Sequence, residues 1–208
     1  MSLYHEGSRE LQDRFDSRRI ADRLEEVNVS STFSDAQREI IDAAAMFWLA
    51  TADADGFPDV SYKGGMPGFV RVVGPSELAF PNYDGNGMYK SLGNVLVNPR
   101  VGLLFIRWSG GQRRVRVQGR ASLHHDDPLM AEWEGAELVV RVRAERIFSN
   151  CPRYLHHMEL REYSAYAPRA GHTPPVPDWK RRPEYRDHLP ARDRAAPAGD
   201  DPPGGDRA

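Results

Sequence analysis

The 208-residue sequence lacks several features that would each point to a particular class of protein. Cys151 is its one cysteine, so no intrachain disulfide can form. No apolar run approaches the roughly 20 residues that cross a bilayer, and the first residues lack the basic-then-apolar form of a signal peptide. The net charge of -2 gives no electrostatic reason to expect nucleic acid or an anionic membrane as a partner. We therefore expect a soluble, cytoplasmic protein that binds neither.

Three regions differ in composition, and they predict three parts of the chain. Residues 1–30 are polar and predict an amphipathic helix or two that docks on another surface. Residues 31–166 hold nearly all of the apolar residues that could form a core. Residues 167–208 contain nine of the 16 prolines; they predict an extended arm across the central domain or a partner subunit, with disorder after about residue 190. The apolar stripe of the first region consists of Leu11, Phe15, Ile20, Leu24 and Val27.

The central region predicts strands joined by short turns, with helices inserted between them. Ser34 followed three residues later by Gln37 predicts a helix start, and Asp55-Gly56 predicts a hairpin turn. Because consecutive strands have short connections, the pattern favours a closed antiparallel barrel over a parallel α/β sheet. The expected strands cover residues 46–51, 59–63, 69–73, 78–81, 101–108, 113–123 and 137–148, and later helices are expected at 128–134 and 152–160.

The stretch that says most about function runs from Gly85 to Asn94, GNGMYKSLGN. A predicted strand ends just before it, at Phe80-Pro81, and a flexible turn leads into a short helix. Lys90 and Ser91 fall in the first turns of this helix, where free backbone N–H groups and the helix dipole favour an anion. The stretch therefore predicts a phosphate-binding site, and with it a nucleotide-type ligand.

Two further segments place cations on strands of the same region. Ser61-Tyr62-Lys63-Gly64-Gly65 ends a strand, and its glycines would let the backbone approach a ligand closely. In the strand RRVRVQGRA, alternate residues from Arg114 to Arg120 share one face. That face is either a solvated surface or a cationic wall that faces a bound anion.

Other interpretations of these residues fit less well. A Walker A loop needs glycine directly before Lys-Ser, where Tyr89 stands, and Gly85-Asn86-Gly87 lacks the third glycine of a dinucleotide fingerprint. The histidines include two adjacent pairs without a second cluster of ligands, so no metal site is expected. Cys151 has no evident His/Asp constellation in sequence, which favours a structural thiol over a nucleophile.

Four segments follow one another in an order typical of one family. They are residues 50–65 (ATADADGFPDVSYKGG), residues 87–105 with Lys-Ser-Leu-x-Asn and then Asn-Pro, residues 114–121, and residues 149–154 (SNCPRY). In this order they resemble the pyridoxamine 5'-phosphate oxidase-like, FMN-binding split-barrel flavoproteins, over roughly residues 34–160. The resemblance implies a mainly β, six-stranded antiparallel split β-barrel with peripheral helices. It also implies a homodimer with FMN at the subunit interface.

The resemblance also implies which residues contact the cofactor. Lys90 and Ser91 would hold the phosphate, and Arg114 would reach the isoalloxazine or the ribityl chain. Two departures from the oxidase itself stand out, since it has Arg in place of Ser61 and Gln in place of Arg114. The residues that would line the flavin are Ser61, Tyr62, Lys63 and Gly64 on one strand, and Pro81 and Asn82 at the end of another.

On this basis we expect an FMN-dependent oxidoreductase in which flavin N5 carries a hydride to or from a small substrate, with NAD(P)H as one candidate electron donor. Tyr62 is a candidate general acid or base, and no catalytic residue is assigned. Two alternatives keep the same barrel. One is an F420-dependent reductase; the other is a non-catalytic carrier or sensor of flavin or haem, with the tail as a partner-binding arm.

Overall fold

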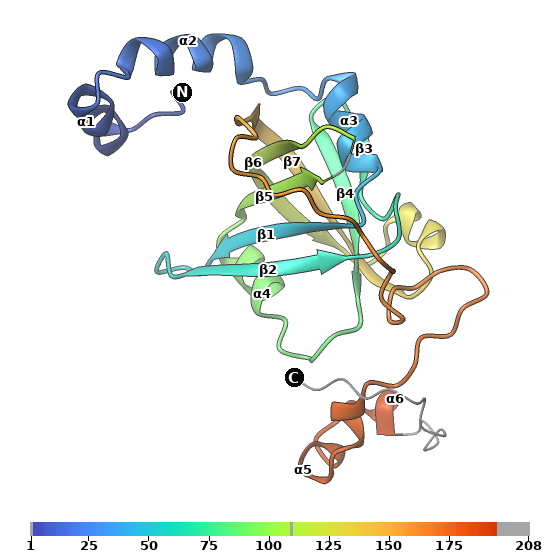
Figure 1. The fold of residues 1–208 in the computed structure, drawn as a ribbon. Helices are drawn as coiled ribbons and strands as arrows, with labels where there is room; N and C mark the ends of the chain where they lie inside the picture. Colours follow the sequence, from blue (N-terminus) through green and yellow to red (C-terminus); the bar gives the residue numbers. More distant parts are fainter. Residues whose placement is uncertain (1, 109, 195–208) are drawn as a thin grey trace.

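The computed structural model describes residues 2–108 and 110–194, and its elements follow one another from α1 to α6 (Figure 1). The predicted disorder after about residue 190 falls mostly on residues 195–208, which lie outside the described residues. The strands are β1 (Met46–Ala52), β2 (Pro58–Gly64), β3 (Arg71–Gly74), β4 (Glu77–Tyr83), β5 (Arg100–Arg107), β6 (Arg113–His124) and β7 (Ala136–Ser149). The helices are α1 (Glu6–Arg14), α2 (Arg18–Asn28), α3 (Asp35–Asp42), α4 (Lys90–Val97), α5 (Pro183–Arg186) and α6 (Ala191–Arg194), with 3-10 turns η1 (Pro128–Glu132) and η2 (Asp178–Arg181).

The strands form one curled antiparallel sheet in the order β2-β1-β5-β6-β7-β4-β3. The predicted antiparallel split barrel is confirmed, with seven strands in place of six. The closed barrel expected from the strand pattern is wrong, because β2 and β3 form the two edges of the sheet. The connection between them contains Pro67, which has no N–H to donate. Its glycines bond elsewhere: Gly65 donates to the Ala45 carbonyl at 3.0 Å and Gly68 to that of Asp42 at 2.9 Å.

The core fills the inside of this curled sheet. Its centre is a cluster of three fully buried rings, in which the Phe47 ring lies 5.0 Å from the centroids of both Phe80 and Phe105. These residues come from β1, β4 and β5, which are distant in sequence. The period of two along each strand puts the neighbouring residues on the outer face. The inner face of β1 therefore faces this core while its outer face is available for other contacts.

Gly119 allows β6 and β7 to cross closely. The pairing register shifts there, so that Gln118 pairs with Arg146 and Gly119 with Ala144, leaving Glu145 as an extra residue. A Cβ atom at position 119 would overlap the carbonyl oxygen of Arg143. The bulge, which bends and twists the longest pair of strands, therefore requires glycine at this position.

The helix start at Ser34 is confirmed: α3 has a complete capping box, in which Ser34 and Gln37 each bond to the backbone N–H of the other. The helix predicted for residues 128–134 is the 3-10 turn η1. The helix predicted for residues 152–160 is wrong, because that segment is irregular. Tyr154, Met158 and Leu160 are exposed, so no apolar surface was available to stabilise a short helix there.

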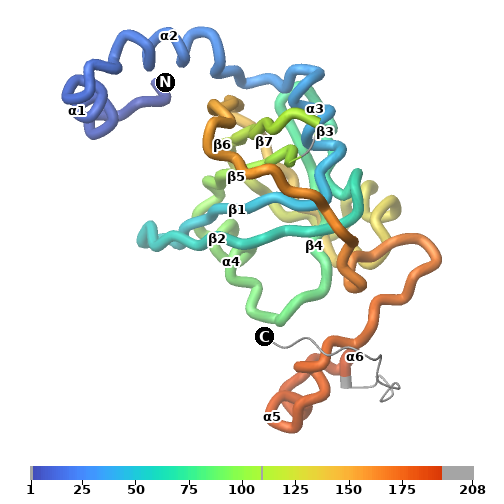
Figure 2. The backbone as a smooth tube through the Cα atoms, in the orientation of Figure 1, coloured from blue at the N-terminus to red at the C-terminus, as the bar shows by residue number. Residues whose placement is uncertain are grey.

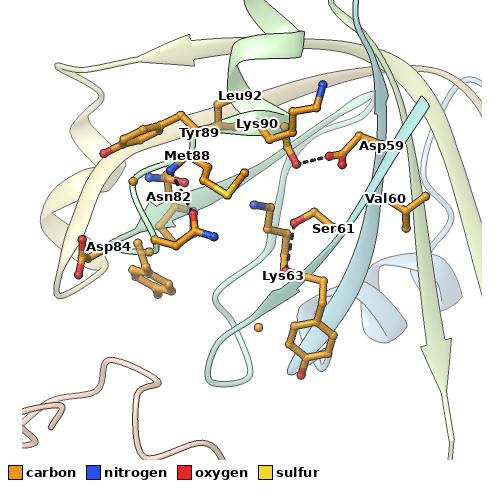
Figure 3. A pocket seen from close by; sticks show the side chains of 18 of the residues that line it. Asp59, Val60, Ser61, Lys63, Asn82, Asp84, Met88, Tyr89, Lys90 and Leu92 are labelled. Carbon is orange, nitrogen blue, oxygen red and sulfur yellow. Dashed lines mark hydrogen bonds between the residues drawn. The ribbon is translucent and has the colours of Figure 1, made fainter. Parts of the chain in front are cut away.

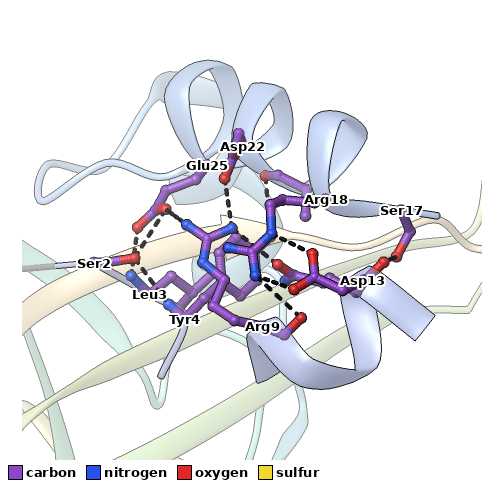
Figure 4. A network of polar contacts seen from close by, with 11 residues as sticks. Ser2, Leu3, Tyr4, Arg9, Asp13, Ser17, Arg18, Asp22 and Glu25 are labelled. Atoms are coloured by element: carbon purple, nitrogen blue, oxygen red, sulfur yellow. Dashed lines mark hydrogen bonds and ion pairs between the residues drawn. The ribbon is translucent and has the colours of Figure 1, made fainter. Parts of the chain in front are cut away.

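Residues 6–28 form a pair of helices at one end of the barrel, at the upper left of Figure 2. Figure 4 shows the ion pairs that hold the pair together: Arg9 with Asp22 at 2.5 Å, and Arg18 with Asp13 at 2.5 Å. Asn28 ties the second helix to β7 through the Ser149 carbonyl, at 2.5 Å. The helices were predicted to dock on another surface, yet their apolar stripe is exposed in this chain; it comprises Leu11, Phe15, Ile20, Leu24 and Val27.

The C-terminal segment crosses to the opposite end of the barrel, where α5 and α6 lie next to the loop between β4 and α4 (Figures 1 and 2). It was predicted to be extended, but residues 178–194 fold into η2, α5 and α6. No helix within residues 2–108 or 110–194 is long and apolar enough to span a membrane.

Candidate functional site

A cavity of about 480 Å³ opens between β2, the end of β4, the loop of residues 84–89 and the start of α4 (Figure 3). This volume lies within the range of about 300–1,000 Å³ that is usual for small-molecule sites. The cavity brings together all but one of the predicted cofactor-binding residues, and the exception is Arg114. Those that line it are Ser61, Tyr62, Lys63, Gly64, Pro81, Asn82, Lys90 and Ser91.

Strand β2 sorts its side chains onto two faces. Asp59, Ser61 and Lys63 pair with inward residues of β1, and so belong to the inner face. Val60 and Tyr62 belong to the outer face, where they are 66% and 62% exposed. Tyr62 therefore meets the cavity only at its rim, on the side where a further surface could approach.

Lys63 is the inner-face cation of the cavity. Its side chain is half-buried and forms no hydrogen bond or ion pair with any residue that the structure describes. Loss of hydration lowers the pKa of the Lys63 ammonium below its ordinary value, although the nearby Asp59 carboxylate opposes that shift. A partly desolvated ammonium without a partner is stabilised by an anion, which makes Lys63 a strong candidate ligand contact.

The start of α4 is the second anion-binding feature. Tyr89 is its N-cap, in a left-handed conformation with φ 48°, and gives no side-chain cap. The first intrahelical bond is that of the Gly93 amide to the Tyr89 carbonyl, so the amides before it have no helical acceptor. Ser91 Oγ, however, donates to Asp59 Oδ2 at 3.0 Å, so a carboxylate already sits near the predicted phosphate site. In Figure 3 the Lys90 ammonium points away from Lys63.

The far wall of the cavity is held by hydrogen bonds to one carboxylate, that of Glu137 on β7. Asn82 Nδ2 donates to Glu137 Oε2 at 3.0 Å, and the Tyr89 hydroxyl donates to the same oxygen at 3.1 Å. Next to Asn82, burial raises the pKa of Tyr83 to about 12. The loop wall therefore presents neutral or already bonded groups to the cavity.

The glycines after Lys63 are also required by packing within the chain, and their predicted role beside a ligand stays a prediction. A Cβ on Gly64 would clash with the Tyr62 ring, and a Cβ on Gly65 would overlap Phe69. The absence of these Cβ atoms makes room for the chain's own aromatic side chains at this strand exit.

Arg114 lies outside the cavity. Its guanidinium donates to the Cys151 carbonyl at 2.8 Å, and its Nε is buried without a partner among the described residues. The other long side chains on that face, Arg116, Gln118 and Arg120, are exposed. Within one chain the face is therefore mostly solvated, and a cofactor role for Arg114 stays a prediction.

The sequence interpretation missed four charged residues next to the cavity: Asp59, Asp84, Glu137 and Lys180. Asp59 shares the period of two with Ser61 and Lys63, and this signal was available in the strand pattern. The others meet only through tertiary packing, as Lys180 Nζ lies 2.5 Å from Asp84 Oδ2 across 96 positions of sequence. Within the described part of the chain, no three His, Cys, Asp or Glu side chains are grouped so that they could hold a metal ion.

A curled antiparallel sheet with a cavity at the start of an inserted helix is the architecture of a split-barrel protein. The family model for pyridoxamine 5'-phosphate oxidase (PNPOx_N) matches residues 33–167, and the chain belongs to that family. No curated protein sequence matches the chain significantly.

Several solved structures resemble this one at low overall similarity. One is a putative pyridoxamine 5'-phosphate oxidase from Lactobacillus delbrueckii, with 27% identity, a TM-score of 0.46, and coverage of 57% of this chain and 95% of that one. An FAD-binding protein from Mesorhizobium loti has 20% identity, a TM-score of 0.42, and coverage of 58% and 94%. The heme storage protein HutZ from Vibrio cholerae has 18% identity, a TM-score of 0.41, and coverage of 56% and 94%. With TM-scores below 0.5, these likenesses do not bear on what this chain binds.

Proposed function

We propose that this protein is an FMN-binding oxidoreductase that works as a homodimer, with the cofactor in the cavity between β2 and α4. The observation that supports this most is that an unpartnered, half-buried Lys63 and an uncapped α4 N-terminus line one cavity. Both features favour an anion, and helix N-termini commonly bind phosphate. Membership of the family favours a flavin mononucleotide as the molecule that carries this phosphate.

In this proposal the first amides of α4, with Ser91 and Lys90, hold the phosphate. Ser91 would then exchange its Asp59 acceptor for a phosphate oxygen, because a single hydroxyl proton serves one strong acceptor at a time. Asp59 therefore competes with the ligand. Lys63, Ser61 and Asn82 would face the remainder of the cofactor.

A bound flavin supplies hydride transfer at its N5. The chain contributes binding and orientation, and Lys63 contributes a positive charge that stabilises negative charge beside it more strongly in a partly desolvated site than in water. Burial raises the pKa of Tyr83 further above neutral pH, so this phenol stays protonated. Tyr62 stays the candidate general acid or base. The proposed substrate is small and redox-active, and NAD(P)H is the proposed electron donor.

The homodimer is supported by the outer face of the sheet. Val60 lines the cofactor cavity and also a second, mainly apolar hollow of about 500 Å³ formed by β1, β2, β5 and β6. The side chains of this hollow include Trp48, Leu104 and Ile106. Contiguous apolar surface of this kind is typical of an interface, and a second copy that covers it would also close the rim of the cofactor cavity.

The alternatives are separated by the choice of ligand. The described residues that line the cavity include no histidine or cysteine, but Tyr62 and Met88 belong to residue types that also ligate haem iron. The absorption spectrum of the bound ligand therefore separates flavin from haem. An F420-dependent reductase would need the same cations, so only binding data distinguish it from an FMN enzyme.

The test is the absorption spectrum of the purified protein. A flavoprotein shows bands at roughly 370 and 450 nm, which belong to the flavin itself. The Lys63→Ala variant should lose these bands, and a control variant, Arg186→Ala, should keep them, because Arg186 is exposed on α5 away from the cavity. Bleaching of the bands by NADPH or NADH would support an enzyme, and a stable oxidised spectrum would favour a carrier. A colourless protein that takes up F420 and not FMN would contradict the proposal.

A further inference from the structure

The C-terminal segment from Asp178 to Asp193 is bonded to the loop that forms one wall of the cofactor cavity. Lys180 is 7% exposed, and its ammonium lies 2.5 Å from Asp84 Oδ2 and 3.0 Å from Asp193 Oδ1. Burial alone would lower the pKa of Lys180, but the hydrogen bonds to Asp84 and Asp193 outweigh burial and raise it. Lys180 therefore stays charged, and its position depends on its two carboxylate partners.

A second cation of the segment reaches the same wall. Arg192 lies 3.0 Å from Asp84 Oδ1 and 2.6 Å from Glu137 Oε1. Glu137 is also the acceptor for Asn82 and Tyr89, both of which line the cavity. A continuous set of ionic and hydrogen bonds thus runs from the C-terminal segment to the cavity.

We propose that Lys180 and Arg192 are positioning residues for cofactor binding: they fix the loop of residues 84–89 and neutralise the carboxylates of Asp84 and Glu137 beside the site. The proposal rests on the function proposed above for the ligand, a phosphate-bearing flavin. The family match ends at residue 167, so it does not cover this segment and assigns it no role. The composition of the segment does not indicate this role either.

The charges show why neutralisation matters. Asp84 and Glu137 carry two negative charges beside a cavity proposed to hold a phosphate, and Asp193 adds a third carboxylate behind them. Lys180 and Arg192 carry two positive charges, which reduce the net charge of this cluster to one negative charge. Without these cations, the carboxylates would repel the phosphate and the loop would lose its anchor. The same loop supplies Tyr89, the residue from which α4 begins.

The test uses full-length variants and two measurements. The first is FMN affinity, followed by quenching of flavin fluorescence; the second is hydrogen–deuterium exchange of residues 84–92 in protein without FMN. The double variant Lys180→Ala/Arg192→Ala should bind FMN at least tenfold more weakly and should exchange faster in that segment. Arg186→Ala removes an exposed arginine of α5 and should change neither measurement.

A charge rescue distinguishes neutralisation from simple tethering. Adding Asp84→Asn to the double variant removes an unpaired carboxylate without restoring the anchor, so affinity for FMN should recover in part. Two results would overturn the proposal. In the first, the triple variant binds FMN as weakly as the double variant, which would make the segment a structural support only. In the second, the double variant has unchanged FMN affinity and unchanged exchange. If the wild type itself fails to bind FMN, the proposed function fails, while faster exchange in the double variant would still support the loop contact.

Discussion

The two walls of the cavity differ in how complete they are within one chain. The loop wall, made by residues 82–89, is bonded through Asn82 and Tyr89 to Glu137, and through Asp84 to the C-terminal segment. The β2 wall is an edge strand with an unpartnered Lys63 on its inner face and exposed Val60 and Tyr62 on its outer face. One wall is preorganised by the chain itself, whereas the other has groups that a ligand and a second subunit would satisfy.

The contrast indicates how binding energy is distributed. A preorganised wall loses little conformational freedom when a ligand arrives, so it contributes geometry. An unsatisfied cation and an exposed apolar face gain new contacts on binding, so the β2 wall should contribute most of the change in free energy. Substitutions on the β2 wall should accordingly have the larger effects on binding and assembly.

The largest effect is expected from Val60→Asp. It would bury an unpaired carboxylate in the proposed subunit interface, which should abolish the dimer and weaken FMN binding with it. Light scattering coupled to size-exclusion chromatography gives the mass, and the control is Val73→Asp on β3, the opposite edge strand. A dimer that survives Val60→Asp would place the interface elsewhere.

The next largest effect is expected from Lys63→Ala. Loss of a charge-assisted contact of about 1.5–3 kcal/mol corresponds to roughly 10- to 150-fold weaker FMN binding. Lys90→Ala should cost less, because the Lys90 side chain is exposed and points away from Lys63. Titration of each apoprotein with FMN measures the two affinities. If Lys90→Ala weakened binding more than Lys63→Ala, the main cationic contact would lie on α4.

A smaller effect is expected from pH. Because desolvation lowers the pKa of Lys63, its charge is lost at a lower pH than the ordinary lysine value of about 10.4. Affinity for an anionic cofactor should therefore fall as the pH rises, starting below that value. The matched control is Lys63→Arg, which stays charged and should keep its affinity for FMN to a higher pH than the wild type.

The smallest effect, and the only gain, is expected from Asp59→Asn. Removing the carboxylate that accepts from Ser91 lowers the competition with phosphate, which should tighten FMN binding by about two- to fivefold, equivalent to roughly 0.4–1 kcal/mol. Isothermal titration calorimetry would detect this change. Weaker binding instead would mean that Asp59 contacts the ligand.

The sequence predicted the parts of this structure that depend on local pattern. Ser34 and Gln37 marked the start of α3, and Asp55-Gly56 marked the turn that leads from β1 into β2. It did not predict the contact between Asp84 and Lys180, since no local pattern links residues so far apart, nor the irregular course of residues 152–160, which depends on whether a surface is present to pack against.

The bulge at Gly119 bears on how the family can vary. Any side chain there would push the Arg143 carbonyl away and separate the two longest strands, so no compensating change in a neighbouring side chain can make space for it. Divergent relatives that keep this register should therefore keep glycine at this position even where the residues of the cavity have changed. Replacement of that glycine in a relative would mark a lineage in which the barrel itself has been rebuilt.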